Sequence, residues 1–255
     1  MLDAVARRLP SENLLYLGDT ARLPYGTKSP ETVKRYAVRA VTLLLERGVK
    51  ALVVACNTAS ALALEAIEAV AEVPVVGVIE PGARVAVARA RTRDQGGAPF
   101  PIAVLGTEAT IASNAYAVAI HRLDPVRPVV NQACPLFVPL AEEGWTENEV
   151  ARAAASLYLA DVARSGARVV VLGCTHYPLL ARTIARALPE GTLLVDSAET
   201  AARAVEVALP PAFRRGETSH GSTRLLVTDA SERLRRVAGR FLGRPAADLT
   251  LVDLP

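Results

Sequence analysis

The sequence predicts an α/β protein of two pseudosymmetric domains, each with a mainly parallel sheet flanked by helices, and a candidate active site in the cleft between them. Apolar runs of about four to eight residues alternate with longer segments of helical period, which indicates β-α-β units. Two of these runs end alike, in Val-Ala-Cys-Asn-Thr and in Leu-Gly-Cys-Thr-His. The repetition suggests two similar domains.

The individual elements follow from these patterns in chain order. The expected strands are the short apolar runs, at 13–17, 51–55, 73–79, 102–105, 129–132, 167–172, 193–195 and 225–227. The expected helices are the longer periodic segments, at 2–9, 30–47, 59–70, 146–165 and 178–188, with a further helix between the strands at 102–105 and 129–132.

The two halves differ in one respect. The second half runs strand 102–107, helix, strand 128–134, helix and the strand that ends at Cys174. The first half opens with a helix and has no counterpart of strand 102–107. This difference bears on function, because ligands bind at the carboxyl ends of parallel strands.

Two crossings between the domains are expected. The Gly- and Pro-bearing segment 78–84 is predicted to be one linker, and Asp196-Ser197 the other, while 91–99 has the composition of a loop. The predicted domains are therefore a discontinuous first domain, 1–82 with 198–255, and a continuous second domain, 83–197.

Composition indicates a soluble globular protein without nucleic-acid or membrane partners. The 255 residues are 51% hydrophobic and 22% charged, the net charge is only +3, and aromatics make up 4%. The densest basic pieces, Arg214-Arg215 and 233–236, are short enough for a solvated helix face. No apolar run reaches the roughly 18 residues of a membrane span, and the start lacks the pattern of a signal peptide. A cytoplasmic location is expected.

The chemistry is expected at the two matching strand ends. A cysteine between a parallel strand and a helix lies among free N–H groups and near the positive end of the helix dipole, which predicts a lowered thiol pKa for Cys56 and Cys174. Asn57, Thr58 and Thr175 add donors that could hold a carboxylate. Two thiols on opposite sides of one carbon can remove a proton from one face and return it to the other, which inverts a stereocentre.

Other readings of the cysteines and other cofactors find less support. Cys134 is expected to be a small buried hydrophobe, and the odd number of cysteines argues against a disulfide framework. A metal site from Cys56, Cys174 and His176 lacks CxxC or HxxxH spacing. No GxGxxG or P-loop is present, and none of the three lysines ends a strand as a pyridoxal phosphate anchor would. We therefore expect neither a metal nor a cofactor.

These residues resemble the glutamate racemases of the cofactor-independent aspartate/glutamate racemase superfamily. The matching segments run through most of the chain in order: LGDTARLPYGTKSPE (17–31), VVACNTASALALE (53–65), VPVVGVIEPGAR (73–84), VLGTEAT (104–110), ACPLFVPLAEEGW (133–145), VLGCTHYPLL (171–180) and VDSAETAAR (195–203).

The resemblance implies interconversion of L- and D-glutamate, with D-glutamate supplied to peptidoglycan synthesis. Cys56 would exchange the α-proton on the D-glutamate side and Cys174 on the L-glutamate side, and Glu142 and His176 match residues that assist the second thiol. The positions that match the family's substrate contacts are Pro24, Tyr25, Gly26, Asn57, Thr58, Thr107 and Thr175. Dimers are common in the family, so a homodimer is possible.

His176 also bears on the substrate. Aspartate racemases read like Cys-Thr-Glu at the place where this chain has Cys174-Thr175-His176. In this resemblance, His176 favours glutamate as the substrate. Other reactions of the superfamily remain alternatives, namely aspartate or hydantoin racemisation or a decarboxylation, as does glutamate binding without catalysis.

One departure concerns the start of the family pattern. The family begins with a strand and a turn reading like DSGVGGLT, whereas this chain starts at what looks like the following helix. Without that strand, neighbouring backbone groups would be unpaired and the acid beside Cys56 would be absent. We expect the polypeptide to begin upstream of Met1; a shortened chain with altered function is the alternative.

Overall fold

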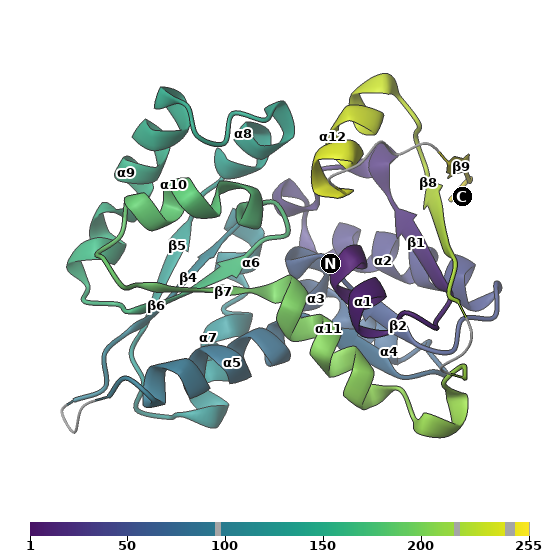
Figure 1. Cartoon of the computed structure of the whole chain (residues 1–255), viewed down its shortest axis with the longest axis horizontal. Coiled ribbons are helices and arrows are strands. Elements are labelled where there is room, and N and C mark those ends of the chain that lie inside the picture. Colours follow the sequence, from purple (N-terminus) through teal and green to yellow (C-terminus); the bar gives the residue numbers. More distant parts are fainter. Residues whose placement is uncertain (95–97, 217–219, 243–247, 255) are drawn as a thin grey trace.

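The computed structural model describes residues 1–94, 98–216, 220–242 and 248–254. It has two lobes (Figure 1). We call the elements from Ile79 to Asp196 the second lobe, and the remaining elements the first lobe. All strand pairs of the described residues are parallel, and helices flank the sheets, so the predicted α/β class is confirmed.

The second lobe has a continuous four-stranded sheet in the order β5-β4-β6-β7. Its strands are β4 (Ile102–Gly106), β5 (Val129–Ala133), β6 (Val169–Gly173) and β7 (Leu193–Asp196). Every residue of β4 and β6 is buried. Burial on both faces explains why these strands are unbroken apolar runs in the sequence.

Helices cover both faces of this sheet. One face packs against α5 (Ile79–Arg91) and α7 (Ala115–Leu123), and the other against α8 (Phe137–Glu143), α9 (Glu149–Arg164), the 3₁₀ helix η3 (Tyr177–Leu180) and α10 (Ala181–Arg186). The short α6 (Glu108–Ala112) is capped by Thr107, whose side chain accepts a hydrogen bond from Thr110 N–H. The cap fixes the turn that follows the central strand.

The first lobe has two separate sheets. β1 (Leu14–Gly18) pairs with β8 (Thr223–Val227), which pairs with β9 (Leu249–Leu251), while β2 (Leu52–Val54) pairs with β3 (Val75–Gly77). Among the described residues, no strand joins β1 to β2. The helices of this lobe are α1 (Leu2–Arg8), α2 (Pro30–Leu45), α3 (Asn57–Leu62), α4 (Leu64–Glu68), α11 (Ser197–Ala208) and α12 (Glu232–Leu242), with 3₁₀ helices η1 (Thr20–Arg22), η2 (Tyr25–Thr27) and η4 (Pro211–Phe213).

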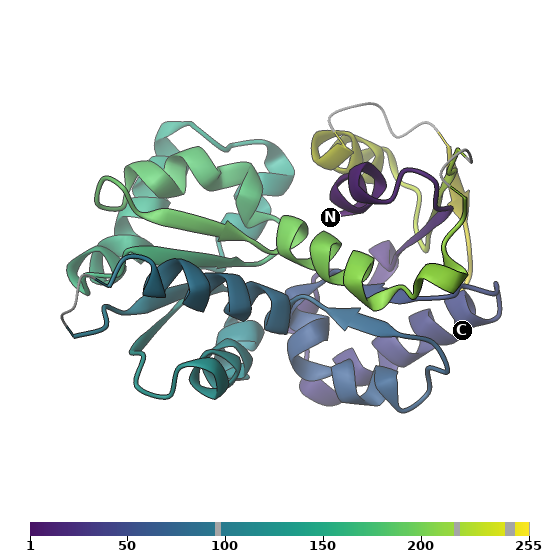
Figure 2. The same cartoon turned by 60° about the horizontal axis from the view of Figure 1, so that its bottom comes forward.

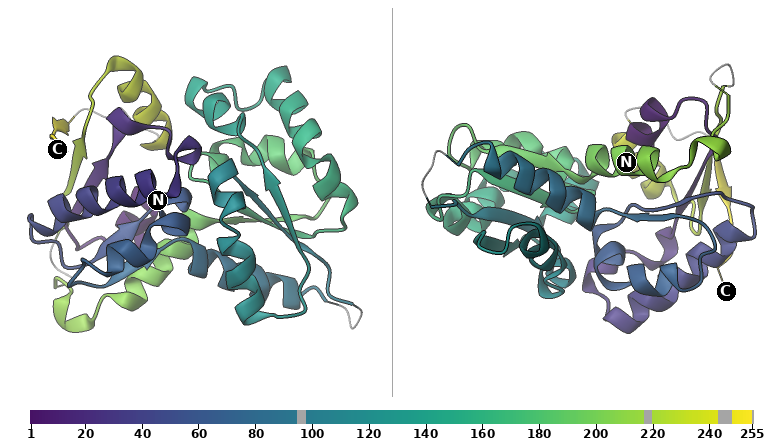
Figure 3. Two further views of the ribbon diagram at one scale, coloured as in Figure 1. Left: turned by 180° about the vertical axis from the view of Figure 1, so that it is seen from behind. Right: turned by 90° about the horizontal axis from the view of Figure 1, so that it is seen from below.

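The helix α11 carries the chain from the second lobe back to the first. It begins where Asp196 accepts a hydrogen bond from Ala198 N–H at 2.7 Å. Figure 2 shows α11 extending between the lobes, and the views of Figure 3 place β4–β7 in one lobe and β1 and β8 in the other. The return of the chain after Asp196 agrees with a discontinuous first domain; the boundaries 1–82, 83–197 and 198–255 stay a prediction.

Several predicted elements differ from the structure. The segment 78–84 is helical rather than irregular, because α5 begins at Ile79 and takes Pro81 into its first turn, where proline is tolerated. The helix expected at 59–70 breaks at Ala63, and the one expected at 178–188 opens as a 3₁₀ turn. Strand β9 was not predicted. Residues 95–97 of the expected loop lie outside the described residues.

In the part of the chain that is described, no helix has both the length and the hydropathy required to cross a membrane.

Candidate functional site

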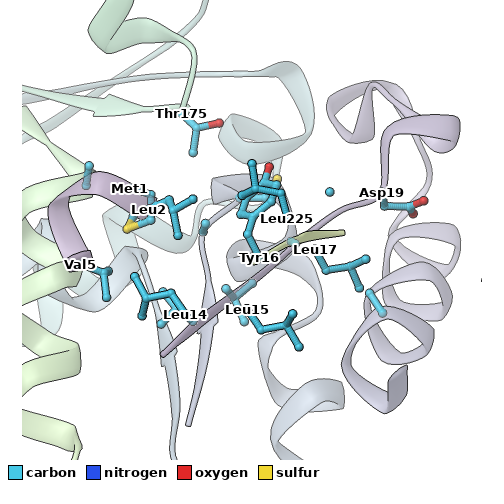
Figure 4. A pocket seen from close by; sticks show the side chains of 18 of the residues that line it. Met1, Leu2, Val5, Leu14, Leu15, Tyr16, Leu17, Asp19, Thr175 and Leu225 are labelled. Atoms are coloured by element: carbon cyan, nitrogen blue, oxygen red, sulfur yellow. The ribbon is translucent and has the colours of Figure 1, made fainter. Parts of the chain in front are cut away.

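One cavity of about 1170 Å³ brings the predicted site residues together. It lies between the lobes and extends into the first lobe between β1 and β2 (Figure 4). All of the residues singled out from the sequence line it: Pro24, Tyr25, Gly26, Cys56, Asn57, Thr58, Thr107, Glu142, Cys174, Thr175 and His176. The two thiols therefore face a common space rather than separate cavities.

Cys56 follows β2 and forms the N-cap of α3. Its thiol is hydrogen-bonded by the N–H groups of Ala59 and Thr58 and by the Thr58 hydroxyl, which favour the thiolate. Burial acts in the opposite direction and is the largest effect, so the pKa of Cys56 is raised. The donors and the position at a helix start are as predicted, but the direction of the pKa shift is not.

Cys174 follows β6 and is buried. Desolvation raises its pKa to about 12, against hydrogen bonds from the N–H groups of His176 and Tyr177 that favour the thiolate. The charges of Cys56 and Glu142 raise the pKa further.

The predicted lowering of both thiol pKa values is thus wrong. A charged sulfur removed from water loses its solvation, and at these two sites this loss outweighs a few N–H donors. A sequence shows which residues cap a helix, but not how deeply the lobes bury the cap. Both shifts favour the neutral thiol.

An imidazole and a carboxylate lie in sequence beside the thiol of Cys174. His176 Nδ1 lies 3.7 Å from Cys174 Sγ, and His176 Nε2 lies 3.3 Å from Glu142 Oε1. When Nε2 donates to the carboxylate, Nδ1 carries a lone pair and can accept the thiol proton. A turn brings Cys174 and His176 together, because Tyr177 N–H donates to Cys174 O at 3.1 Å.

We call His176 and Glu142 the relay. The end of α12, in the first lobe, packs against it. The ring of Phe241 makes an edge-to-face contact with His176 at 5.1 Å between centroids. Arg240 donates a hydrogen bond to the carbonyl oxygen of Glu142. Glu142 and His176 belong to the second lobe, whereas Figure 1 shows α12 in the first lobe, so these contacts join the two lobes.

Three hydroxyls meet between the lobes. Thr58 of the first lobe lies 3.0 Å from Thr107 and 3.1 Å from Thr110, and these two lie 3.0 Å apart. Gly26 of the first lobe approaches Thr107 so closely that a Cβ there would lie 2.7 Å from Thr107 Cβ. The loop can therefore reach the second lobe only with glycine at this position.

Two further side chains order the Cys56 region. Tyr116 of α7 donates to Asn57 Oδ1 at 2.7 Å, while Asn57 Nδ2 lies 3.5 Å from Ser197 Oγ. On the other side, Tyr25 donates to Asp19 Oδ2 at 2.6 Å, and Thr228 donates to Asp19 Oδ1 at 3.0 Å. Burial, then the Asp19 carboxylate, raises the pKa of Tyr25.

Sequence reasoning missed four of these contributors: Asp19, Thr110, Tyr116 and Phe241. Asp19 and Thr110 lie inside segments that matched the family, but nothing in their local pattern distinguishes them. Tyr116 is separated from its partner by 59 positions, so only the fold brings them together. Cys134 is buried, as expected.

Within the described residues, no group of three or more His, Cys, Asp or Glu side chains is placed to hold a metal ion.

Comparisons with known proteins agree with this geometry. The family model for Asp/Glu/Hydantoin racemase matches residues 1–205. Over 100% of this chain and 92% of the relative, the sequence is 50% identical to a glutamate racemase of Geobacter metallireducens. Glutamate racemase isoform RacE1 of Bacillus anthracis superposes with a TM-score of 0.90 at 34% identity, covering 100% of this chain and 92% of that one.

A second solved structure holds a ligand. The glutamate racemase of Francisella tularensis in complex with D-glutamate has a TM-score of 0.90 and 32% identity, and the superposition covers 99% of this chain and 92% of that one. The two strand-end cysteines and the cavity they share are thus found in a chain that matches racemases along its whole length. This chain belongs to the Asp/Glu/Hydantoin racemase family.

Proposed function

We propose that this protein is a glutamate racemase that interconverts L- and D-glutamate by moving the α-proton between Cys56 and Cys174. The observation that carries the proposal is that both thiols line one cavity together with the side chains able to hold an amino acid. The names of the relatives support glutamate as the substrate.

The exchange needs one thiolate and one thiol at a time. In the D-to-L direction, the Cys56 thiolate removes the α-proton and becomes a thiol, while the Cys174 thiol donates its proton to the opposite face and becomes a thiolate. The reverse reaction starts from the thiolate at Cys174, and His176 with Glu142 carries that proton to and from the sulfur. No electrons are transferred, so the reaction balances without a cofactor.

The raised thiol pKa values fit this scheme when the substrate is considered. An ammonium group beside a buried sulfur favours the thiolate, because opposite charges stabilise each other where water is excluded. Substrate binding would thus create the base at the moment it is used. A thiol that stays neutral without substrate is also less open to oxidation.

The substrate's carboxylates need donors on both sides of the cavity. The Asn57 amide, the hydroxyls of Thr58, Thr107 and Thr175, and the Pro24-Tyr25-Gly26 loop supply them. Aspartate racemases read like Cys-Thr-Glu where this chain has Cys174-Thr175-His176. The histidine at this place favours glutamate over aspartate as the substrate. The proposal includes a cytoplasmic location, a homodimeric assembly and the supply of D-glutamate to peptidoglycan synthesis.

Racemisation in heavy water tests the mechanism. With either enantiomer of glutamate, optical rotation should decay to zero while deuterium enters Cα, and aspartate should react far more slowly. Cys56→Ser and Cys174→Ser should each lower turnover by roughly 10²–10⁴-fold, the usual contribution of a general acid or base. Cys134→Ser is the matched control, because Cys134 is also a buried cysteine but does not line the cavity.

Two outcomes contradict the proposal. Racemisation without deuterium at Cα would exclude proton exchange with a solvent-linked base. Full activity of either serine variant would exclude the two-thiol assignment, whatever the substrate.

A further inference from the structure

The relay is only loosely held by its own contacts. His176 Nδ1 lies 3.7 Å from Cys174 Sγ, and His176 Nε2 lies 3.3 Å from Glu142 Oε1. The second distance exceeds the roughly 2.7–3.2 Å of a well-formed N–H···O hydrogen bond. Both relay side chains are about one-fifth exposed, so water can compete for their polar atoms. The orientation of the imidazole therefore depends on a further contact.

Phe241 of α12 supplies such a contact from the first lobe. Its ring meets the His176 imidazole edge-to-face, with 5.1 Å between the centroids and 87° between the planes. Aromatic rings favour this geometry, because the positive edge of one ring faces the negative face of the other. Rotation of the imidazole away from this angle would weaken the contact and would move Nδ1 away from the sulfur of Cys174.

The neighbouring Arg240 holds the other member of the relay. Its guanidinium donates a hydrogen bond to the carbonyl oxygen of Glu142. This carbonyl lies in the last turn of α8, where carbonyls lack donors within the helix and where the helix dipole favours a cation. The contact fixes the backbone from which the Glu142 carboxylate extends towards His176.

Gly144 leaves room for this guanidinium. The helix α8 ends at Glu143, and Gly144 follows it in a left-handed conformation with φ of 76°. A Cβ built on Gly144 would lie 2.8 Å from Arg240 Cζ and 2.9 Å from Arg240 Nε. One glycine therefore ends α8 and also admits a side chain from the other lobe.

We propose that Phe241 and Arg240 are positioning residues for proton transfer at Cys174, because they hold His176 and Glu142 in the orientation in which Nδ1 accepts the thiol proton. The donors to Cys56, by contrast, belong to α3 of its own lobe. The relay is thus complete only while α12 is docked across the cleft. The catalytic consequence rests on the proposed racemisation, whereas the positioning of His176 does not.

Steady-state kinetics tests the role of the Phe241 ring. Phe241→Leu keeps an apolar side chain without the ring, so kcat should fall roughly tenfold while KM changes by less than about twofold. Phe241→Tyr keeps the ring and should restore about half of the parent kcat or more. Phe213→Leu is the matched control, because Phe213 is an exposed aromatic residue of the same lobe that does not line the cavity. Its kcat should equal that of the parent.

Deuterium exchange at Cα without inversion shows which thiol is affected. In Phe241→Leu, this exchange should fall roughly tenfold from L-glutamate, where Cys174 acts, and persist from D-glutamate, where Cys56 acts. Phe241→Tyr should restore the exchange from L-glutamate. An equal fall from both enantiomers would indicate a general disturbance of the cleft and would overturn the proposal.

Glycine substitutions test the contact of Arg240 with Glu142. Gly144→Ala places a methyl group against the end of a flexible side chain, so the guanidinium should leave the carbonyl. kcat should then fall roughly fivefold, as in Arg240→Met. Gly166→Ala is the matched control, because Gly166 has a φ of 78° and nothing within 4 Å of its Cβ position. Arg236→Met removes an exposed charge one turn earlier on α12 and should leave kcat unchanged.

A measurement that needs no turnover separates this inference from the proposed function. Nitrogen-15 NMR at about pH 8.5, where a histidine side chain is ordinarily neutral, reports which ring nitrogen carries the proton. The parent should show the Nε2–H tautomer of His176, identified by loss of its signal in His176→Gln. In Phe241→Leu the two tautomers should mix. His121 is the internal control, because its Nε2 lies 3.0 Å from Arg127 O.

The outcomes distinguish the two proposals. A parent chain that does not racemise glutamate refutes the proposed function, and the tautomers of His176 then decide the positioning. If the parent racemises glutamate while Phe241→Leu keeps the parent kcat, exchange and tautomer, the positioning role is refuted and the proposed function stands. An Nδ1–H tautomer in the parent also refutes it. Should Phe241→Leu not fold, Arg240→Met is used for the same measurements.

Discussion

The two strand ends that carry the thiols look alike in sequence but differ in surroundings. After β6, Cys174 is backed by an imidazole at 3.7 Å and a carboxylate one step further. After β2, Cys56 is hydrogen-bonded by N–H groups and the Thr58 hydroxyl. Cys174 therefore has a proton relay, whereas the protonation of Cys56 depends on local hydrogen bonds. The two thiols should respond differently to substitution of their neighbours.

Among changes to the surroundings of the thiols, the largest effect is expected from removing the His176 imidazole. His176→Gln should lower kcat/KM about 100-fold, within the range for general acid–base groups. This loss must be equal in both directions, because the enantiomers have equal free energy. Deuterium wash-in separates the thiols: exchange without inversion should persist from D-glutamate, where Cys56 acts, and fall from L-glutamate.

Cys56→Ser provides the mirror control for this experiment. Its wash-in should persist from L-glutamate and fall from D-glutamate. Equal wash-in from both enantiomers in the His176→Gln protein would show that His176 serves both thiols and would remove the asymmetry.

Alkaline pH should distinguish the thiols through stability. Burial raises the pKa of Cys174 from 9.0 to about 12. Above pH 9 the unfolded chain loses this proton while the folded chain keeps it, so the free energy of unfolding falls as pH rises towards 12, by about 1.4 kcal/mol per pH unit from this group.

Urea denaturation between pH 8 and 10.5 measures this dependence. Cys174→Ser should flatten the slope relative to the parent chain, and Cys56→Ser should flatten it less because Cys56 is only half-buried. An unchanged slope in Cys174→Ser would show that the buried thiol does not govern the alkaline loss.

A smaller effect is expected from the tyrosine that links the second lobe to the Cys56 side. Tyr116→Phe removes the 2.7 Å hydrogen bond to Asn57, which is worth about 1 kcal/mol. kcat/KM should fall about fivefold, mainly through a higher KM, because Asn57 would be less well oriented towards the substrate. Tyr158→Phe is the control, since its hydroxyl accepts a hydrogen bond from Leu136 N–H away from the cavity; an equal rise in KM there would contradict a positioning role for Tyr116.

The smallest effect concerns the carboxylate of the relay. The Glu142 charge raises the pKa of Cys174, so Glu142→Gln should lower it and speed alkylation of Cys174 by iodoacetamide roughly threefold at pH 8. Glu143→Gln is the matched control, because Glu143 is the next residue in the chain and its side chain is exposed. Slower alkylation of Cys174 in Glu142→Gln would show that the relay affects the thiol through proton transfer alone.

The sequence carries much of the fold because parallel strands are buried on both faces. β4 and β6 appear as unbroken apolar runs, and the polar residues that follow them mark the carboxyl edge where ligands bind. Seven of the eleven site residues follow β2, β4 or β6 and converge on one cavity for this reason. The starts of helices are harder to predict from sequence. Taken alone, Pro81 and Gly82 indicate a linker, but they lie in the first turns of α5.

The remaining features depend on distance in sequence and on burial. The contact of Tyr116 with Asn57, and that of Phe241 with His176, join segments that no local pattern connects. The direction of the thiol pKa shifts is set by how completely the lobes exclude water, which helix position alone does not report. Both kinds of information exist only after the lobes pack.

The seam between the lobes at Thr58, Thr107 and Thr110 consists of neutral hydroxyls. Parting them exchanges hydrogen bonds within the protein for hydrogen bonds to water, a change with a small net cost, and leaves no charge stranded. A racemase that admits substrate and releases product benefits from such a contact, because the hydroxyls pair specifically when the lobes meet and can exchange their partners for water when the lobes part.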